Sequence, residues 1–305
     1  RSAAVSELLD EGDPGFVEIR QPADLPGVEL LVAERSVRRW VVLHHAYALC
    51  TVLDLARPVP WKYRGRRFDL GGDGCSFMEP GEVHANLRVS DPATFRVLFL
   101  EPGLVEKAAA EIGIAGAIHF KLAQIDQASH PQLRRALLAF HASLEQRATQ
   151  LERESLLVRC LELAFRQCAE RAPPPPRVTA CLPSVLRARE YIEEHLTEPV
   201  RLDELVAAAG APSRFQLVRS FAATTGLPPH AYQIQRRINL ARQLLAHGLA
   251  PADIAVRLGF VDQSHFSRHF KRVVAVPPAT YQRAVCADRR SGDRGSIRAR
   301  PPGCR

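Results

Sequence analysis

The stretch between Arg201 and Tyr281 contains one sequence pattern twice, at a constant offset of 49 residues and without a gap. Glycines, prolines, aromatic residues and an arginine recur in register: Gly210 and Gly259, Arg219 and Arg268, Phe221 and Phe270, Pro228 and Pro277, Pro229 and Pro278, Tyr232 and Tyr281. The apolar positions between them correspond as well. A constant offset with matched turn and core residues indicates one structural unit that is used twice.

Each copy predicts a short helix, a tight turn and a second helix. Leu202–Ala209 has amphipathic spacing and stops at Gly210, which can adopt the left-handed conformation that follows a helix. Ser213 is a suitable N-cap for a helix that runs to about residue 225. The second copy predicts helices over 252–258 and from about 262 to 274. This order is the helix-turn-helix arrangement, whose second helix lies in the major groove of DNA.

A single helix, Pro229–His247, is predicted between the two copies. Proline suits its first turn and Gly248 its end. At 1.5 Å per residue this helix spans roughly 28 Å, and successive major-groove faces on one side of B-DNA lie about 34 Å apart. A rigid connector of this length can therefore present both second helices to adjacent grooves.

Charge is distributed unevenly along this chain of 305 residues, whose net charge is +8. Residues 1–176 carry 21 basic and 23 acidic side chains, whereas residues 177–305 carry 20 basic and 10 acidic ones. A basic C-terminal part suggests a polyanionic partner, although many soluble domains are basic without binding nucleic acid.

The composition excludes several other classes of protein. Hydrophobic residues make up 46% and charged residues 24%, which is typical of a soluble globular protein. The apolar runs are far shorter than the roughly 20 residues of a membrane span, and the sequence opens with no secretory leader. Seven cysteines without a CxxC pair indicate reduced thiols rather than a disulfide framework or a zinc site. We therefore expect a cytoplasmic protein without membrane association.

Four consecutive prolines, Pro173–Pro176, cannot lie inside a helix and mark a domain boundary. The predicted organisation is an N-terminal domain over 1–172, a proline-rich linker over 173–183, a DNA-binding domain over 184–287 and a disordered basic tail over 288–305. Within the first domain, residues 16–100 show short strands separated by turn signals, as in a sandwich or small barrel. Helical spacing follows over 103–113 and 131–171, and these helices serve either as a dimer seam or as a cover for the barrel.

Two segments resemble the AraC/XylS transcription regulators. Asp253–Arg272, followed by Pro277-Pro-Ala-Thr-Tyr281, is similar to the family signature, and Ser213–Phe221 is similar to its first recognition helix. Gly74–His84 resembles a stretch of the cupin-type effector domains of this family. The resemblance implies an α+β multidomain protein, with a cupin-like β-barrel, appended helices and an all-α module with two helix-turn-helix units. Ala275 stands where the family usually has glycine.

The resemblance also implies which residues contact DNA. Those expected to face bases are Phe215, Val218, Arg219, Gln263, Ser264, Ser267 and Arg268. Arginine suits the O6/N7 edge of guanine and glutamine suits adenine. Phosphate or flanking contacts are expected from Arg214, Gln216, His265, Lys271 and Arg272. The alternative for each arginine is a solvated surface charge, and for Phe215 a place in the core.

Candidate effector-binding residues are large or polar side chains near predicted strands, each of which could equally be core or surface: His44, Trp61, Arg64, Phe77, His84 and Arg96. The adjacent His44 and His45 point to opposite faces of a strand, and no His-x-His pair is present. We therefore expect no catalytic metal, no cofactor and no enzymatic activity.

These observations predict a transcription factor, more often an activator than a repressor, that binds double-stranded promoter DNA as a homodimer. An unidentified small-molecule effector in the barrel is expected to control it, and RNA polymerase is a further candidate partner. Two alternatives remain open at this point. One is a metal-dependent cupin enzyme with a DNA-binding tail, and the other is an effector-free regulator whose N-terminal domain binds another protein.

Overall fold

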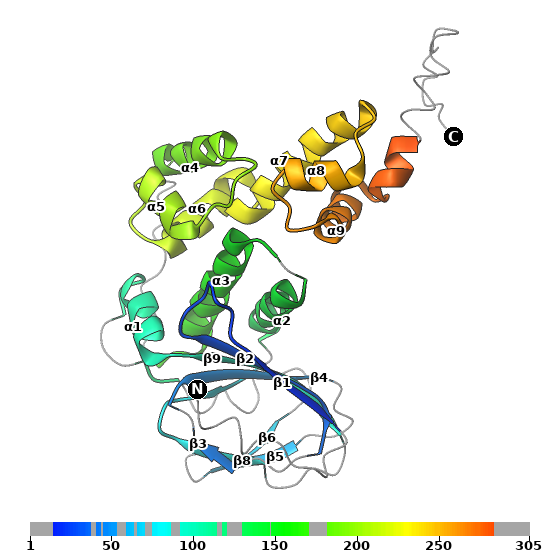
Figure 1. The fold of residues 1–305 in the computed structure, drawn as a ribbon. Coiled ribbons are helices and arrows are strands. Elements are labelled where there is room, and N and C mark those ends of the chain that lie inside the picture. The colour runs from blue at the N-terminus through cyan, green and yellow to red at the C-terminus, as the bar shows by residue number, and fades with distance from the viewer. Residues whose placement is uncertain are drawn as a thin grey trace, which may run out of the picture.

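The structure, a computed structural model, describes residues 15–37, 41–43, 45–53, 59–63, 66–70, 75–86, 92–114, 118–120, 130–146, 148–170 and 182–283. Most of the predicted linker and the whole predicted tail lie outside these ranges. Within the described residues, an N-terminal part with two β-sheets and three helices lies below a C-terminal module whose regular elements are all helices (Figure 1). The predicted α+β organisation is thereby confirmed.

Two antiparallel sheets form the N-terminal part. The five-stranded sheet has the order β1-β2-β9-β4-β7, with β1 Phe16–Arg20, β2 Val28–Ser36, β9 Ala93–Leu100, β4 Tyr47–Leu53 and β7 Cys75–Met78. The four-stranded sheet has the order β3-β8-β5-β6, with β3 Val41–Leu43, β8 Val83–Asn86, β5 Val59–Tyr63 and β6 Arg66–Leu70. All of these strands fall within the region that the turn signals assigned to β-structure.

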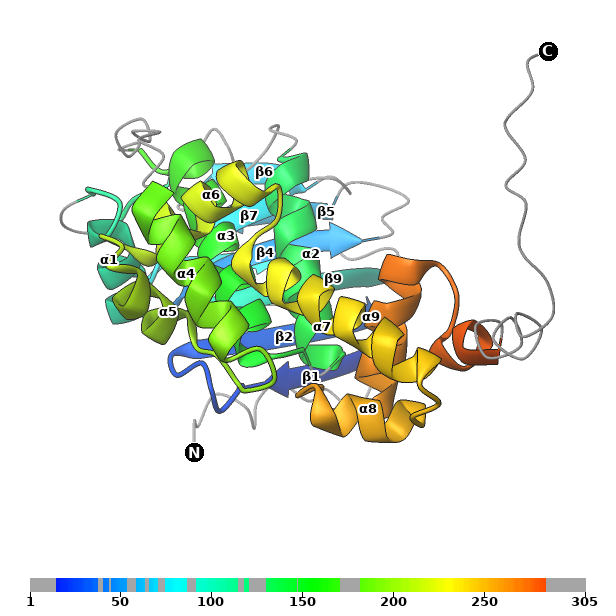
Figure 2. The same ribbon diagram turned by 90° about the horizontal axis from the view of Figure 1, so that it is seen from above.

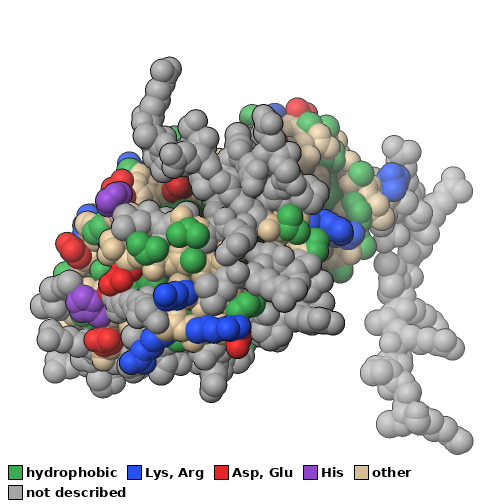
Figure 3. All heavy atoms as spheres, turned by 90° about the horizontal axis from the view of Figure 1, so that it is seen from below, with side chains coloured by type: hydrophobic (Ala, Val, Ile, Leu, Met, Phe, Trp, Pro, Cys, Tyr) green, Lys and Arg blue, Asp and Glu red, His purple; other side chains and the backbone are tan. Residues whose placement is uncertain are grey.

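The five-stranded sheet is covered on both faces. Alternate residues of a strand point to opposite sides, so its strands contribute side chains to two separate layers of the core. One face, with Leu31 and Cys50, packs on Trp61 and Tyr63 of the second sheet. The second sheet exposes its outer face, where Lys62 is exposed between these two buried aromatic residues. Figure 3 shows basic side chains on the surface seen from below, on the far side from the helical module.

Three helices cover the other face of the five-stranded sheet: α1 Pro102–Ala110, α2 Pro131–Glu145 and α3 Gln150–Cys168. The predicted apolar stripe along the last two of these is confirmed, and Leu133, Leu137, Phe140, Leu151 and Phe165 are fully buried. α3 begins at Thr149, whose hydroxyl accepts a hydrogen bond from the Glu152 backbone N–H at 3.3 Å. These helices cover the sheet, which is one of the two roles that the sequence left open for them.

The helical module consists of α4 Leu182–Glu194, α5 Leu202–Ala209, α6 Arg214–Thr225, α7 Pro229–Ala246, α8 Pro251–Arg257 and α9 Gln263–Val274. α4 thus starts just inside the segment predicted as linker. The predicted capping residues are confirmed, since the Ser213 side chain accepts from the Gln216 N–H and Gly210 is left-handed with φ 58°. In the second unit Asp262 accepts from the His265 N–H and Gly259 has φ 68°. α5–α6 and α8–α9 are therefore the two helix-turn-helix units, and α7 joins them.

Arg237 of α7 fixes the two units relative to each other. Its guanidinium is buried and donates to the carbonyls of Leu196 at 2.6 Å, Glu198 at 2.9 Å and Gly259 at 2.7 Å. The first two carbonyls follow α4, and the third lies in the turn of the second unit. Burial lowers the pKa of Arg237 to about 10, which keeps it charged near pH 7. The connector is therefore braced at its middle and does not act as a hinge.

Ala275, which ends α9, has a positive φ of 70°. An L-residue with a Cβ pays about 1–2 kcal/mol in this conformation, whereas glycine does not. The strain that a substitution by glycine relieves is partly offset, because glycine also raises the conformational entropy of the unfolded chain. We expect Ala275→Gly to raise the free energy of unfolding by about 0.5–1 kcal/mol in denaturant titrations. Ala223→Gly, at an exposed position inside α6, should instead lower it by about 1 kcal/mol; two losses of equal size would contradict the prediction.

Within the described residues no helix is long and apolar enough to cross a lipid bilayer.

Candidate nucleic-acid interface

The second helix of each unit, α6 or α9, lies on the side of the module that faces the N-terminal part (Figures 1 and 2). α6 packs on α3, and apolar side chains of both belong to one continuous cluster. Within it Phe215 is 1% exposed and Val218 is 7% exposed. Both were predicted to face bases, and in this arrangement both lie in the core. For Phe215 this is the alternative that the sequence had left open.

Arg219 and Arg268 occupy equivalent positions of the repeat, and the N-terminal part contacts both. Arg219 Nη1 donates to Glu162 Oε1 on α3 at 3.0 Å. Arg268 Nη2 donates to the backbone carbonyl of Gln146, at the end of α2, at 2.6 Å. The two arginines that were expected to face bases therefore both donate hydrogen bonds to the N-terminal part.

Two further pairs join the same surfaces. Arg214 Nη2 lies 2.5 Å from Glu111 Oε1, just after α1, and His269 Nε2 lies 3.8 Å from Glu152 Oε2 on α3. We use the name closed interface for these contacts, which join four residues of the N-terminal part to four of the helical module: Glu111, Gln146, Glu152 and Glu162 with Arg214, Arg219, Arg268 and His269.

Glu162 is the most enclosed carboxylate of the closed interface. It is 4% exposed, and besides Arg219 it contacts Arg159 at 3.2 Å and Arg166 at 3.1 Å on its own helix. A buried carboxylate is retained at low cost only when it is paired and hydrogen-bonded in this way. A phosphate oxygen of DNA would present the same charge and the same acceptor geometry to Arg219.

The other predicted contacts on α9 are divided between surface and interior. Gln263, Ser264, Lys271 and Arg272 are exposed, and Ser267 is partly buried. His265, expected at a phosphate, is 1% exposed, and its ring lies 4.5 Å from that of His269 between centroids. On α6, Gln216 is partly buried. The exposed set on α9 remains available for contacts with DNA.

Burial shifts the pKa values around His265. Desolvation lowers the pKa of His265 to about 4 and that of His269 to about 3, with further lowering from nearby arginines. Desolvation also raises the pKa of Glu152, against the opposing effect of Arg272, Arg268 and Arg153. Both imidazoles are therefore neutral near pH 7, with Glu152 beside them.

The acidic half of the closed interface had escaped the sequence interpretation. Glu111, Glu152 and Glu162 lie on or beside amphipathic helices, where an isolated carboxylate is indistinguishable from a solvated one. The only signal was the acidic balance of residues 1–176 against the basic balance of the remainder.

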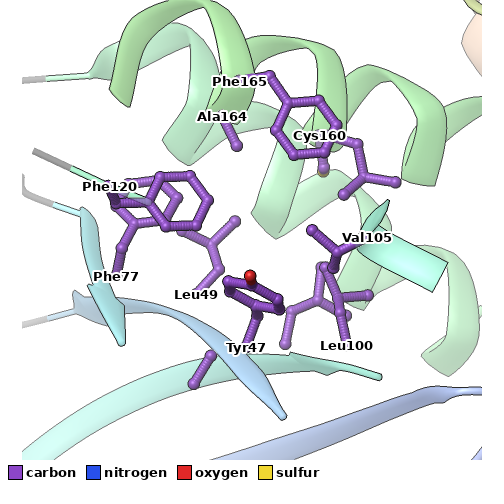
Figure 4. Close-up of a pocket in the computed structure, with 12 residues that line it drawn as sticks. Tyr47, Leu49, Phe77, Leu100, Val105, Phe120, Cys160, Ala164 and Phe165 are labelled. Atoms are coloured by element: carbon purple, nitrogen blue, oxygen red, sulfur yellow. The ribbon is translucent and has the colours of Figure 1, made fainter. Parts of the chain in front are cut away.

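A second candidate site is a small cavity between the five-stranded sheet and the helices that cover it (Figure 4). Its walls are almost wholly apolar and include Tyr47, Phe77, Leu100, Phe120 and Phe165. The Tyr47 hydroxyl donates to the Ile118 carbonyl at 2.9 Å. The volume is about 20 Å³, enough for about one water molecule. A larger ligand would enter only if these side chains or α3 moved.

Of the candidate effector residues, Phe77 lines this cavity. Trp61 lies between the two sheets, where it stacks on Tyr63 and meets His84 edge-on. Arg96 of β9, the central strand of the five-stranded sheet, pairs with Glu34 at 3.0 Å. His44 and Arg64 lie outside the described residues. The described candidates therefore do not converge on one pocket.

Comparison with known proteins gives matches in both parts of the chain. Residues 206–284 match the family model described as a helix-turn-helix domain, and residues 59–161 match the AraC-like ligand binding domain. The uncharacterized HTH-type transcriptional regulator YbfI of Bacillus subtilis is 31% identical over 175 residues, which are 56% of this chain and 61% of that protein. The chain thus spans less than two thirds of this relative.

A shorter relative is matched over most of its length. The regulatory protein SoxS of Salmonella typhimurium is 37% identical over 94 residues, which are 30% of this chain and 87% of SoxS. Among solved structures, a transcriptional regulator from Chromobacterium violaceum, described by its AraC-type DNA-binding domain, is 30% identical. That match covers 35% of this chain and 93% of the other, with a TM-score of 0.32.

Proposed function

Since this chain belongs to the AraC/XylS family of transcriptional regulators, we propose that it binds promoter DNA through α6 and α9 under the control of its N-terminal domain. One observation carries the proposal. The arginines at equivalent positions of the two reading helices, Arg219 and Arg268, are both engaged by the α2–α3 pair. One guanidinium cannot hold Glu162 and a DNA acceptor in the same geometry at once, so closure and DNA binding compete.

The mechanism is a shift between two populations. In the closed form the closed interface occupies the reading helices, and in the open form they are free to enter adjacent major grooves. DNA binds the open form better and therefore draws the equilibrium towards it. If the closed form predominates by a factor of 100, the apparent affinity for DNA is lower by about the same factor.

A small-molecule effector would act through α3. Cys160, Leu161 and Ala164 of this helix line the apolar cavity, while Glu162, between them in sequence, holds Arg219. A ligand that enlarges the cavity displaces the helix from one side and disturbs the ion pair on the other. The cavity and the Glu162–Arg219 ion pair lie on the same rigid helix, so a displacement of α3 couples them directly. The apolar lining favours a ligand with a hydrophobic body.

Further parts of the proposed function follow from the family. We expect gene activation rather than repression, a homodimer on paired half-sites, and action in the cytoplasm together with RNA polymerase. For the N-terminal domain we favour effector binding over catalysis, and native mass spectrometry of the purified chain, which detects a retained small molecule, tests this expectation.

Arg268→Ala tests the reading role of α9. The operator is first obtained by selection from random DNA at a stated salt concentration, because phosphate contacts make affinity salt-dependent. We expect the variant to lose about 1–3 kcal/mol at the cognate site and much less on random DNA. Opening of the closed interface changes both affinities by the same factor, so their ratio isolates base reading.

Arg272→Ala is the matched control, one turn further along the same helix and exposed. It should weaken cognate and random binding alike and reduce the slope of affinity against salt by about one ion. Equal losses on both DNAs for Arg268→Ala would assign this arginine to a phosphate. Absence of any selected sequence with the wild-type chain would refute the proposed function.

A further inference from the structure

Glu152, His265 and His269 bring three potential metal ligands together across the closed interface. The histidines lie one turn apart on α9, at i and i+4, so both point from the same face of the helix. Glu152 comes from the first turn of α3. One donor atom from each of the three lies within 4.8 Å of the other two, and Glu152 Oε2 is 3.8 Å from His269 Nε2.

This spacing is close to that of a coordinated metal. Bonds of 2.0–2.1 Å at tetrahedral angles place the donor atoms of a zinc site roughly 3.3 Å apart. The three donors here would need to approach one another by about 1.5 Å or less, which side-chain rotations can provide. Two imidazoles and one carboxylate form a donor set that zinc uses in proteins, with a fourth position left for water or another ligand.

Two atoms of the cluster lack a hydrogen-bonding partner in the structure. Glu152 Oε2 and His265 Nε2 are both buried, and neither makes a hydrogen bond with any of the residues that the structure describes. Buried polar atoms of native proteins are nearly always satisfied, so each such atom requires an explanation. A divalent cation between them would satisfy both atoms.

Two features oppose a cation and narrow its identity. His265 Nδ1 accepts a long hydrogen bond from the Val261 N–H at 3.4 Å, and coordination through Nε2 would move the ring proton to Nδ1 and break this contact. Arg268 and Arg272 lie close enough to affect the pKa of Glu152 and would repel a positive ion. Only a metal with high affinity for imidazole overcomes these costs, which favours late first-row ions over Mg²⁺ or Ca²⁺.

We propose that Glu152, His265 and His269 form a binding site for a late first-row divalent cation, with Zn²⁺ as the leading candidate, that fastens α9 to α3. Because the ligands come from both parts of the chain, the complete site exists only in the closed form. Bound metal therefore stabilises closure and weakens DNA binding, by linkage. This regulatory consequence rests on the proposed function, whereas metal binding itself does not.

The first experiment uses the full chain without DNA. After treatment with a chelator, the protein is titrated with Zn²⁺ in a calorimeter and with Co²⁺ in an absorption spectrometer. We expect one equivalent to bind with a dissociation constant below about 1 µM, and Co²⁺ to give visible bands of four-coordinate nitrogen and oxygen ligation without a thiolate charge-transfer band. Thiolate bands, or no stoichiometric binding, would overturn the site.

Variants assign the ligands. Glu152→Gln preserves shape, lies outside both reading helices, and should weaken Zn²⁺ binding by at least tenfold. His247→Gln removes an exposed histidine at the end of α7 and should leave binding unchanged. His269→Ala provides a second test if Glu152→Gln proves unstable in circular dichroism. Equal affinity in wild type, Glu152→Gln and His269→Ala would refute the assignment.

The second experiment measures DNA affinity with and without one equivalent of Zn²⁺. We expect Zn²⁺ to lower the affinity of the wild type at least fivefold and to leave that of Glu152→Gln unchanged. Metal binding without an effect on DNA would refute the link to closure and leave the site in place. A chain that binds Zn²⁺ but no DNA at all would instead refute the proposed function.

Discussion

Glu162→Gln is expected to raise the affinity for DNA by about tenfold, which corresponds to about 1.4 kcal/mol. The substitution keeps the shape of the side chain but removes the charge that holds Arg219 from a buried position. Charge-assisted hydrogen bonds contribute about 1.5–3 kcal/mol, and only the closed form contains this one. Loss of the bond therefore favours the open form, and the full difference appears in DNA binding as long as the closed form predominates.

Fluorescence anisotropy with cognate and random duplexes provides the measurement. The ratio of the two affinities should stay constant, because opening frees the reading helices for any DNA. Glu106→Gln on α1 is the matched control, since it makes the same charge change at an exposed position and should alter affinity by less than about twofold. If Glu162→Gln behaves like this control or weakens binding, the closed interface does not restrain the reading helices.

Gly259→Ala is expected to cost the most stability, at least about 3 kcal/mol. A Cβ at this position would lie 2.0 Å from the Thr197 carbonyl oxygen and 2.8 Å from its carbon. Both atoms belong to the backbone, so no side-chain rotation relieves the contact. The left-handed conformation, with φ 68°, adds about 1–2 kcal/mol for a residue with a Cβ.

Gly248→Ala separates the two contributions. This glycine is also left-handed, with φ 86°, but a Cβ there would meet no atom of the described residues within 4 Å. It should cost only the conformational term of about 1–2 kcal/mol. The two variants are compared by denaturant unfolding followed by circular dichroism. Equal losses would show that Gly259 does not approach Thr197 closely in solution.

The sequence predicted the helical module well because its signals are local. Ser213 as an N-cap and Gly210 as a helix stop each act within a few residues and leave a mark at a fixed spacing. The repeat then placed the second unit from the first. The helical stripe of α2 and α3 was equally visible, because burial on a helix has a period of 3.6 residues.

The closed interface could not be predicted in the same way. Arg219 meets Glu162 across 57 residues and Arg268 meets Gln146 across 122 residues. Such pairs depend on how two domains dock, and no local pattern encodes docking. For the same reason the sequence did not connect Glu152 with His265 or His269, and His265 was predicted only as a phosphate or flanking contact. The sequence likewise does not show which face of a sheet lines a cavity. The candidate effector residues therefore lie in different parts of the N-terminal domain.

The contacts of Arg237 and Gly259 have a consequence for the operator. Contacts with backbone carbonyls hold the two helix-turn-helix units in one arrangement. The distance between their DNA-reading helices is therefore fixed. One additional base pair between the two contacted segments shifts the second by about 3.4 Å and turns it by roughly 34° around the duplex axis. A protein with a flexible connector could adapt to this change, whereas a protein with a rigid connector cannot. We therefore expect all target sites to have the same spacing between the two contacted segments.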